Sequence, residues 1–407
     1  MNQVTLSKVI GESGIFIDGD WIESKDQDVN GDVRLIQLAD VGDGFFINKS
    51  HRFLTSEKAK ELKCTYLKED DLLIARMPDP LGRACVFPGL ETQAVTVVDV
   101  CIVRPDPRIA DINWLKFLIN SPLFRNNIRQ YIKGTTRQRI SRGNLEKIRF
   151  HLPPLPDQLH IASLLGKAET LISQRKESIR LLNEFLKSTF LEMFGDLSSN
   201  NYKSYQINEL KSGGNGTFSN GPFGSDLLTS ELTDNGVPVI YVRDIKNGNF
   251  IWKSHVYVTE TKADYLINCQ VISDDVIIAK VGDPPGSSAV YPKGLGRSII
   301  TQDVIRLRLN QEVAHPIYFS HFLNSDFGVH LMKKIIIKGT RMRFALGSFK
   351  KLSINIPPIT SQTQFAQIVE KAEALKVQYQ QSLQELENLY GSLSQRAFRG
   401  ELMKNKI

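Results

Sequence analysis

The sequence predicts an α/β (α+β) fold in which two copies of one globular domain are separated by two long helices that pair with each other. Three observations predict it: a long-period internal repeat, short β-rich segments within each copy, and a heptad pattern at the end of each copy. The chain has 407 residues, and a single hydrophobic core stops growing at roughly 250 to 300 residues. More than one domain is therefore expected.

The internal repeat has a period of 204 residues, so that Asp40 recurs as Asp244 and Asp70 as Asp274. With one single-residue slip, the same spacing relates Gly44 and Gly248, Phe46 and Phe250, Asp79 and Asp283, Asp99 and Asp303, Arg104 and Arg308, Asn120 and Asn324, Pro153 and Pro357, and Gln158 and Gln362. Solenoid repeats have periods of about 20 to 50 residues, so this is a domain duplication. A duplicated chain imitates a homodimer with pseudo-two-fold symmetry, which suits duplex DNA.

Composition and charge are typical of a globular protein in water. Hydrophobic residues make up 41% and charged residues 23%, and no apolar run reaches the roughly 18 residues of a membrane span. We expect no membrane segment and no secretory signal at the start of the chain. The four cysteines are far apart without C-x-x-C spacing, which argues against zinc and disulfides and favours the cytoplasm. The formal net charge of +7 favours a polyanionic partner.

Each copy ends in a segment with the spacing of a long helix. Pro153 and Pro154 interrupt the preceding structure, Asp157 can cap a helix that starts there, and no glycine lies between Gly166 and Gly195. The seam positions fall on alternating steps of three and four; their apolar members are Leu165, Ala168, Ile172, Ile179, Leu182, Leu186 and Met193, and then Val369, Ala372, Leu383, Leu386, Leu393 and Ala397. Matching seams predict that the helices pair as a spacer. The alternative is that each helix packs only on its own domain.

A basic loop follows a predicted helix in the body of each copy. The bodies have strand-like segments at 71–76 and 275–280 and helix-like segments at 111–131 and 316–334. Glycine lets a backbone approach a ligand, and Thr and Arg can bond phosphates or bases. The alternative, a solvated basic loop, is weakened by recurrence in both copies. The candidate DNA contacts are Lys133, Thr135, Thr136, Arg137, Arg139 and Arg142 in the first loop, and Lys338, Thr340, Arg341 and Arg343 in the second.

Three further candidates lie near predicted strand ends. Arg76 and Lys280 each follow a strand and precede an Asp-Pro-x-Gly turn, where they either contact DNA or are turn residues with a snorkelling cation. Ser225 lies in Gly221-Pro222-Phe223-Gly224-Ser225, which has no counterpart 204 residues earlier. If the two copies bind different ligands, their differences should lie in such loops.

Signals for independent catalysis are mostly absent. Asp283-Pro284-Pro285 is similar to the start of the Asp-Pro-Pro-aromatic motif of amino-methyltransferases, but Gly286 stands where the base-stacking aromatic belongs. The sequence has no G-x-x-x-x-G-K-[ST] loop and no H-E-x-x-H motif. We expect no catalytic residue and no metal site.

The chain resembles the DNA specificity subunit of type I restriction-modification systems over essentially its whole length. The resemblance rests on the Lys-Gly-Thr loops at 133 and 338, the Pro-Pro-x-x-x-Gln sequences at 153 and 357, and the final Ala397-Phe398-Arg399-Gly400-Glu401-Leu402. It implies two target-recognition domains, each followed by a conserved spacer helix, and an antiparallel coiled coil of the two helices. The implied boundaries are 1–152 and 198–356 for the recognition domains, and 153–197 and 357–407 for the helices.

The resemblance also implies a function. Each recognition domain would read one half of a bipartite site in double-stranded DNA, and two modification subunits would dock on the helices. Those partners would supply S-adenosylmethionine and adenine N6 methylation, while restriction/translocase subunits would supply cleavage that depends on ATP and Mg. This chain would then be non-catalytic and hold no cofactor. Two alternatives stay open: a stand-alone bipartite DNA-binding protein, and a complete methyltransferase in one chain.

Overall fold

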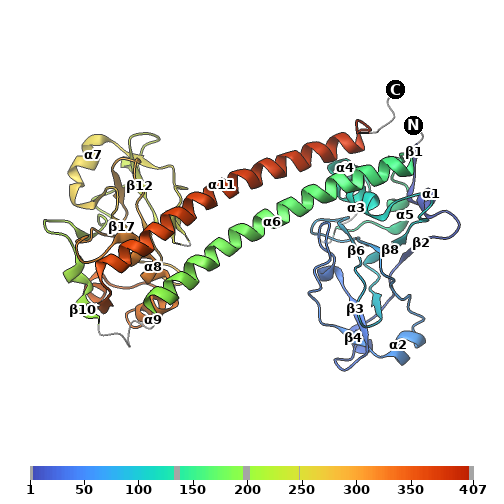
Figure 1. The fold of residues 1–407 in the computed structure, drawn as a ribbon, viewed down its shortest axis with the longest axis horizontal. Coiled ribbons are helices and arrows are strands. Elements are labelled where there is room, and N and C mark those ends of the chain that lie inside the picture. The colour runs from blue at the N-terminus through green and yellow to red at the C-terminus, as the bar shows by residue number, and fades with distance from the viewer. Residues whose placement is uncertain (1–2, 133–137, 196–201, 247, 403–407) are drawn as a thin grey trace. The chain divides into compact units, whose positions relative to one another are not determined.

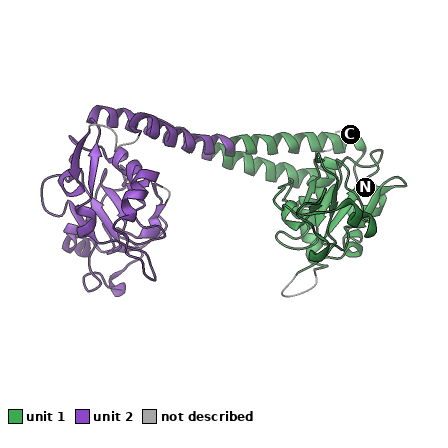
Figure 2. Cartoon of the chain, turned by 90° about the horizontal axis from the view of Figure 1, so that it is seen from below, with its two compact units in different colours: residues 1–176, 381–407 green, residues 177–380 purple. Residues whose placement is uncertain are grey.

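The computed structural model describes residues 3–132, 138–195, 202–246 and 248–402. The chain divides into two compact units (Figure 2): unit 1 comprises residues 1–176 and 381–407, and unit 2 comprises residues 177–380. Two long helices, α6 (Leu155–Phe194) and α11 (Ile359–Phe398), each contribute one part to each unit (Figure 1). No helix in the described ranges is long and apolar enough to cross a membrane.

Unit 1 is built on two small sheets. The first is antiparallel with the order β2-β8-β5-β6, and the second has the order β4-β3-β7, in which β3 and β7 are parallel. A short pair joins β1 to β9. The elements are β1 (Gln3–Val4), α1 (Leu6–Ile10), β2 (Ile15–Asp18), β3 (Val33–Ile36), β4 (Phe53–Leu54), α2 (Ser56–Glu61), β5 (Leu72–Ala75), β6 (Ala84–Val86), β7 (Ala94–Thr96), β8 (Val100–Arg104), α3 (Ile112–Asn120), α4 (Pro122–Arg129), α5 (Arg142–Glu146) and β9 (Phe150–His151).

Unit 2 repeats this architecture. Its sheets have the orders β11-β20-β17-β18 and β15-β12-β19-β16, with β12 and β19 parallel, and β10 pairs with β21. The elements are β10 (Lys203–Gln206), β11 (Phe218–Asn220), β12 (Val237–Ile240), β13 (Ile245–Lys246), β14 (Asn249–Phe250), β15 (Tyr257–Val258), α7 (Glu260–Tyr265), β16 (Gln270–Val271), β17 (Val276–Ala279), β18 (Ser288–Val290), β19 (Ser298–Ile300), β20 (Val304–Leu307), α8 (Pro316–Asn324), α9 (Asp326–Lys333), α10 (Leu346–Lys350) and β21 (Ser353–Ile356). The strands predicted within 71–76 and 275–280 are β5 and β17, whose residues are all buried.

The two segments predicted as helical before the basic loops each contain a break. Ser121 separates α3 from α4, and Ser325 separates α8 from α9. Both serines have extended backbone, and each hydroxyl accepts a hydrogen bond from a backbone N–H three residues later. Serine is a favoured N-cap because its side chain satisfies one of the free N–H groups at a helix start. The serine therefore ends one helix and starts the next at a new angle.

A repeated glutamine ties the start of each long helix to the body of a unit. In unit 1 the amide of Gln158 donates to the carbonyls of Ile109 and Pro153 at 3.0 and 2.8 Å. In unit 2 the amide of Gln362 donates to the equivalent carbonyls at 3.0 and 2.8 Å. Both glutamines are fully buried. The glutamine of each Pro-Pro-x-x-x-Gln sequence thus joins the start of a long helix to the body of its unit, and we call this set of hydrogen bonds the glutamine clasp.

A repeated carboxylate and a repeated arginine form the same buried ion pair in both units. The carboxylate of Asp71 is fully buried and accepts two hydrogen bonds from Arg104 at 2.6 and 2.8 Å. Asp275 and Arg308 repeat this geometry at 2.7 and 2.8 Å. Breaking such a pair by removing one partner leaves an uncompensated buried charge, which costs about 3 to 5 kcal/mol. This pair and the glutamine clasp account for several of the polar residues in the repeat.

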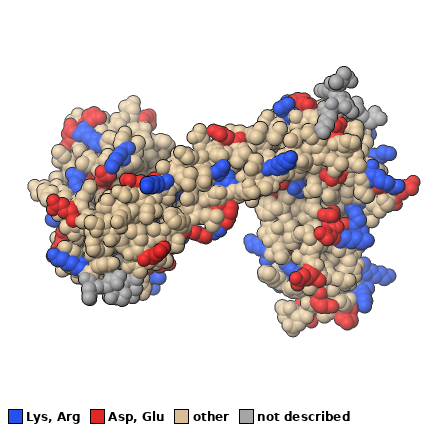
Figure 3. Space-filling view, in the orientation of Figure 1, with Lys and Arg blue, Asp and Glu red and all other residues tan. Residues whose placement is uncertain are grey.

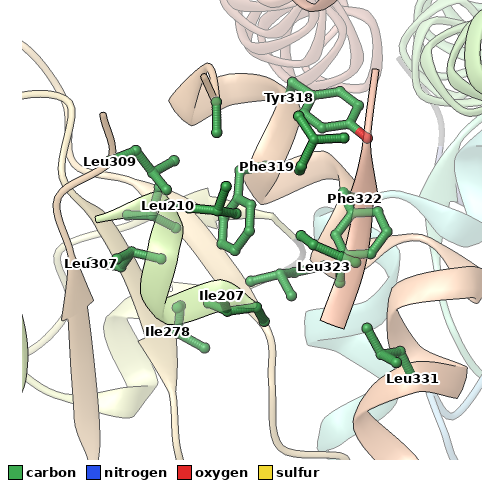
Figure 4. Close-up of a cluster of buried hydrophobic side chains, with 14 of the residues drawn as sticks. Ile207, Leu210, Ile278, Leu307, Leu309, Tyr318, Phe319, Phe322, Leu323 and Leu331 are labelled. Atoms are coloured by element: carbon green, nitrogen blue, oxygen red, sulfur yellow. The ribbon is translucent and has the colours of Figure 1, made fainter. Parts of the chain in front are cut away.

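The hydrophobic core of each unit contains the beginning of one long helix and the end of the other. In unit 1, Ile161 and Leu165 of α6 pack with Phe398 of α11 and with Trp114. In unit 2 the core contains the end of α6 and the start of α11, and Figure 4 shows the part of it that surrounds Phe319 and Phe322 of α8. The contributing long-helix residues of unit 2 are Leu186, Phe190, Phe194, Phe365, Val369 and Ala372.

These contacts make the helix pair antiparallel, because a helix start meets a helix end in each unit. An ion pair between Lys176 of α6 and Glu387 of α11, with 2.9 Å between Nζ and Oε1, adds a contact between the helices. The positions of the predicted seam, which include Ile172, Ile179, Leu182, Leu383, Leu386 and Leu393, are all buried or half-buried. The helices contact each other and each contributes to the cores of both units, which the alternative of a helix packed only on its own domain does not allow.

Candidate nucleic-acid interface

In unit 2 the second basic loop forms a hairpin after α9. The N–H of Ile337 donates to the carbonyl of Arg343 at 2.7 Å, and the N–H of Arg343 donates back at 3.2 Å. Lys338, Thr340 and Arg341 lie between these two residues and are exposed, as is Arg343. The hairpin therefore presents all four predicted contact residues to solvent.

The hairpin docks on the end of β17, so the two predicted contact regions of unit 2 meet. The N–H of Phe344 donates to the carbonyl of Lys280 at 3.3 Å, and the N–H of Gly282 donates to the carbonyl of Met342 at 3.1 Å. Phe344 is buried in the core and anchors the end of the hairpin. A pocket of about 490 Å³ lies between the two segments, lined by Val242, Val281, Gly282, Asp283, Asp303, Gly339, Thr340, Arg341 and Met342.

The cations of this hairpin have no acidic partner among the described residues. The ion pairs of unit 2 within that part of the chain use Arg180, Lys262, Arg297, Arg308 and Lys376. Burial lowers the pKa of Lys280, while the nearby Asp303 raises it and Arg343 lowers it. Figure 3 shows Lys and Arg mixed with Asp and Glu on the face in view. The hairpin therefore presents cations that no carboxylate of the described residues neutralises.

The described end of the first basic loop, from residue 138 onward, docks on unit 1 in the same way. Lys133, Thr135, Thr136 and Arg137 lie outside the described residues. Beyond them, the N–H of Ile140 donates to the carbonyl of Arg76 at 3.1 Å, just as Phe344 donates to Lys280. Ile140 is buried in the core of unit 1. The duplicated sequence therefore places a basic loop on the end of a central strand twice.

The two described arginines of the first loop do have carboxylate partners. Nη2 of Arg139 lies 3.2 Å from Oδ1 of Asp99, and Nε of Arg142 lies 3.6 Å from Oδ2 of Asp18. Arg142 also donates to the carbonyl of Phe16 at 2.8 Å. Both guanidinium groups remain partly exposed. A polyanion would have to compete with these acids in unit 1, whereas it would meet unpaired cations in unit 2.

Arg76 is placed as a structural residue and not as a surface contact. It is only 4% exposed, its Nε lies 3.5 Å from Oδ1 of Asp18, and its guanidinium donates to the carbonyl of Val98. The carboxylate of Asp18 draws the side chain inward, so the predicted DNA contact does not fit this position. The alternative of a turn residue with a snorkelling cation does not fit it either, because the guanidinium is buried and paired inside the unit. Lys280, at the equivalent place, is half-buried.

The loop that contains Ser225 lies at the same edge of unit 2 as the hairpin. The N–H of Gly221 donates to the carbonyl of Val304 at 3.2 Å. A Cβ on Gly221 would lie 2.3 Å from the carbonyl oxygen of Ile300, so the backbone approaches too closely for any other residue. Ser225 itself is exposed. Asp303, which lines the pocket, belongs to the turn between β19 and β20 that this loop covers.

This loop has no counterpart 204 residues earlier, but the structure places one at a spacing of 202. Strand β2 pairs with β8 as β11 pairs with β20, but the residue numbers of β2 and β11 differ by 202. Gly19 therefore corresponds to Gly221: its N–H donates to the carbonyl of Val100 at 2.8 Å, and its Cβ would lie 2.3 Å from a carbonyl oxygen of Val97. A length difference of two residues in the following loop hides the match from a fixed period.

The described residues contain no group of three or more His, Cys, Asp or Glu side chains that could hold a metal ion. All four cysteines are free thiols. Burial raises the pKa of Cys85 to about 12 and that of Cys64 to about 11. Thiols of this kind stay protonated and unreactive near neutral pH.

Comparison with known proteins identifies the family. The model of the type I restriction modification DNA specificity domain matches residues 9–181 and 223–388. The chain belongs to this family. The two matched segments of this DNA specificity chain reflect its duplication, since each covers most of one body and of the helix that follows it.

Curated relatives and solved structures agree with this assignment. A putative type I restriction enzyme MjaX specificity subunit of Methanocaldococcus jannaschii is 21% identical over 70% of this chain and 67% of its own length. The EcoKI specificity subunit of Escherichia coli is 22% identical over 74% of this chain and 68% of its own length. The crystal structure of the type I S subunit from M. genitalium matches 98% of this chain and 96% of its own with a TM-score of 0.58 at 14% identity, which shows the same fold.

Sequence reasoning missed the acids that organise this part of the specificity chain. Asp18 pairs with both Arg76 and Arg142, and Asp99 pairs with Arg139. These partners lie far apart in the sequence, so no local spacing marks them. The available signal was the duplication of Asp99 as Asp303, which already indicated that this acid has a fixed place in the fold.

Proposed function

We propose that this chain recognises a bipartite sequence in double-stranded DNA, with one half read by each body. The observation that carries the proposal is that a basic loop docks on the same strand end in both units, through Ile140 on Arg76 and Phe344 on Lys280. Two equivalent cationic loops in one chain suit two half-sites on a duplex. In this proposal residues 1–152 and 198–356 read the DNA, and residues 153–197 and 357–407 form the spacer.

Within each loop, different residue types have different tasks. Unpaired Lys338, Arg341 and Arg343 are suited to phosphates, whose contacts position the protein without carrying sequence information. Sequence is read where an Arg or a polar side chain reaches base edges in a groove. The pocket beside Thr340, with Asp283 and Asp303 in its wall, supplies acceptors as well as donors for base edges. This combination distinguishes a reading surface from a purely electrostatic one.

The long helices offer a surface for two modification subunits. The seam positions face inward, whereas large apolar side chains are exposed elsewhere on the same helices: Leu159, Leu171, Leu181, Phe185, Leu191, Val377 and Leu389. In unit 1 a groove of about 780 Å³ between α3 and α6 is lined in part by Phe117, Leu159 and Leu171. Exposed apolar surface of this extent is typical of protein interaction sites. Docked subunits would cover it.

Catalysis would belong to the partners. The modification subunits would bind S-adenosylmethionine and methylate adenine N6, and restriction/translocase subunits would use ATP and Mg to cleave DNA. Asp283-Pro284-Pro285 supports this division, because Gly286 leaves no aromatic ring to stack on a target base.

Methylome sequencing of a host with and without this gene tests the proposal most directly. Loss of adenine methylation at one split motif, with a fixed unread gap, is the expected result. An unchanged methylome in a host that expresses the modification subunits would contradict it. Purification separates the alternatives: a chain that binds a split site with full affinity alone would be a stand-alone DNA-binding protein, and methyl transfer by the pure chain would make it a complete methyltransferase.

A further inference from the structure

Two large aromatic side chains are exposed at equivalent places in the two units. Trp21 is 70% exposed in unit 1, and Phe223 is 68% exposed in unit 2. Each lies two residues after the glycine that packs against a strand turn, Gly19 or Gly221. The structural correspondence between β2 and β11 therefore pairs these two aromatic residues, which the 204-residue period does not.

In each unit the aromatic residue lies at the edge that carries the basic loop. In unit 1, Asp20 forms a parallel bridge with Val97, in the turn that leads to Asp99, the partner of Arg139. In unit 2 the turn beneath Gly221 leads to Asp303, which lines the pocket under the hairpin. In both copies the backbone segment that carries the aromatic residue therefore packs on the strand turn whose Asp lies beside the basic loop.

Most of the surface of each ring is open to solvent and is not used in the packing of its own unit. The indole N–H of Trp21 donates to Oε1 of Glu23 at 3.4 Å, a long bond that leaves the ring in solvent. Trp21 and Phe223 differ in residue type, but both have an exposed aromatic ring at the equivalent position of the fold. Nucleic-acid-binding proteins combine exposed aromatic side chains, which contact bases, with Lys and Arg side chains, which contact phosphates.

We propose that Trp21 and Phe223 are base-contacting wedges, each of which places its ring against one base step of its half-site and partly unstacks it. The inference rests on the proposed function, because it needs a duplex bound at these edges. The glycine two residues earlier lets the backbone pack closely on the strand turn, which places the aromatic residue at the equivalent position in each unit. The wedge favours sequences whose steps unstack easily, so it contributes to specificity without a hydrogen bond.

The test uses the full chain assembled with its modification subunits and a duplex that contains the target found by methylome sequencing. Trp21→Ala and Phe223→Ala should each weaken binding to this duplex by roughly 5- to 150-fold, the range found for loss of one aromatic–base contact. Trp21→Phe and Phe223→Trp should keep most of the affinity. The matched control is Tyr265→Ala: Tyr265 is also 70% exposed, but it lies on α7 beneath the ammonium group of Lys262.

A second measurement reports the wedge itself. Duplexes that carry 2-aminopurine at successive positions should become fluorescent on binding at one step in each half-site. Trp21→Ala should abolish the signal in one half only, and Phe223→Ala in the other. If both alanine variants bind the target like the parent and leave the 2-aminopurine signals unchanged, the wedge is wrong and the proposed function stands. If the parent complex itself shows no sequence preference, the proposed function falls and the wedge with it.

Discussion

The unpaired cations of the unit 2 hairpin permit a quantitative test of charge at the interface. Arg341 and Arg343 are both exposed, and no described carboxylate pairs with either side chain. Replacing both by Ala should therefore change the free energy of unfolding by less than about 0.5 kcal/mol. For DNA the consequence is larger. Each lost phosphate contact lowers the slope of log affinity against log salt by about 0.9, so two contacts lower it by about 1.8.

The assay is fluorescence anisotropy of a labelled target duplex over a series of salt concentrations. A double variant that loses slope equally on target and non-target DNA identifies phosphate contacts. A loss of about 1 to 3 kcal/mol confined to one half-site identifies a base contact. Arg297→Ala is the control, because Arg297 is committed to Glu260 and Asp264. The reasoning is refuted if the folded double variant keeps the affinity and the salt slope of the parent.

Three further outcomes are expected. Gln362→Leu removes the clasp at the start of α11 and leaves buried carbonyls without donors, so the unfolding free energy of unit 2 should fall by about 2 to 4 kcal/mol in urea titrations. Burial lowers the pKa of His321 to about 4, whereas the unfolded histidine binds its proton near pH 6.5. The stability that this neutral histidine contributes should therefore be complete above pH 6.5 and fall as the pH drops toward 4. His321→Phe should flatten this pH dependence in thermal melts. One extra heptad in α6 after Lys176 and in α11 after Gln380 adds about 10 Å to each helix. Methylome sequencing should then show that the unread gap between the half-sites is longer by about three base pairs. An unchanged gap would contradict the proposed spacer role.

The two long helices could be predicted from the sequence, because a heptad pattern depends only on spacing within one element. The seam positions from Leu165 to Leu186 and from Val369 to Leu393 are buried or half-buried, as the alternating steps require. The breaks at Ser121 and Ser325 were less visible, since apolar residues continue at helical spacing on both sides of each serine. Element type therefore followed from periodicity, while the position of each break depended on a cap that competes with helix continuation.

The candidate site could be predicted only in part. The basic loops were found because they are dense in charge and duplicated. The burial of Arg76 could not be foreseen, because it depends on Asp18, which reaches it through the pairing of β2 with β8. Trp21 and Phe223 were also missed as a pair, since a loop that differs in length by two residues separates them from the rest of the repeat. Contacts set by strand pairing, and matches across length changes, need the fold.

The comparison of the two copies also indicates why the two half-sites should differ. In unit 1, Asp18 joins Arg76 to Arg142 and so ties the basic loop to β2. The structurally equivalent positions in unit 2 hold Asn220, Lys280 and Leu346. The acid and one cation are both absent, so the ion pairs that link the loop to β2 in unit 1 have no equivalent with β11 in unit 2, and the formal charge of the three positions is the same in both units. A shared frame with differently held loops predicts an asymmetric bipartite target, because the same backbone edges present different donors and acceptors to the DNA.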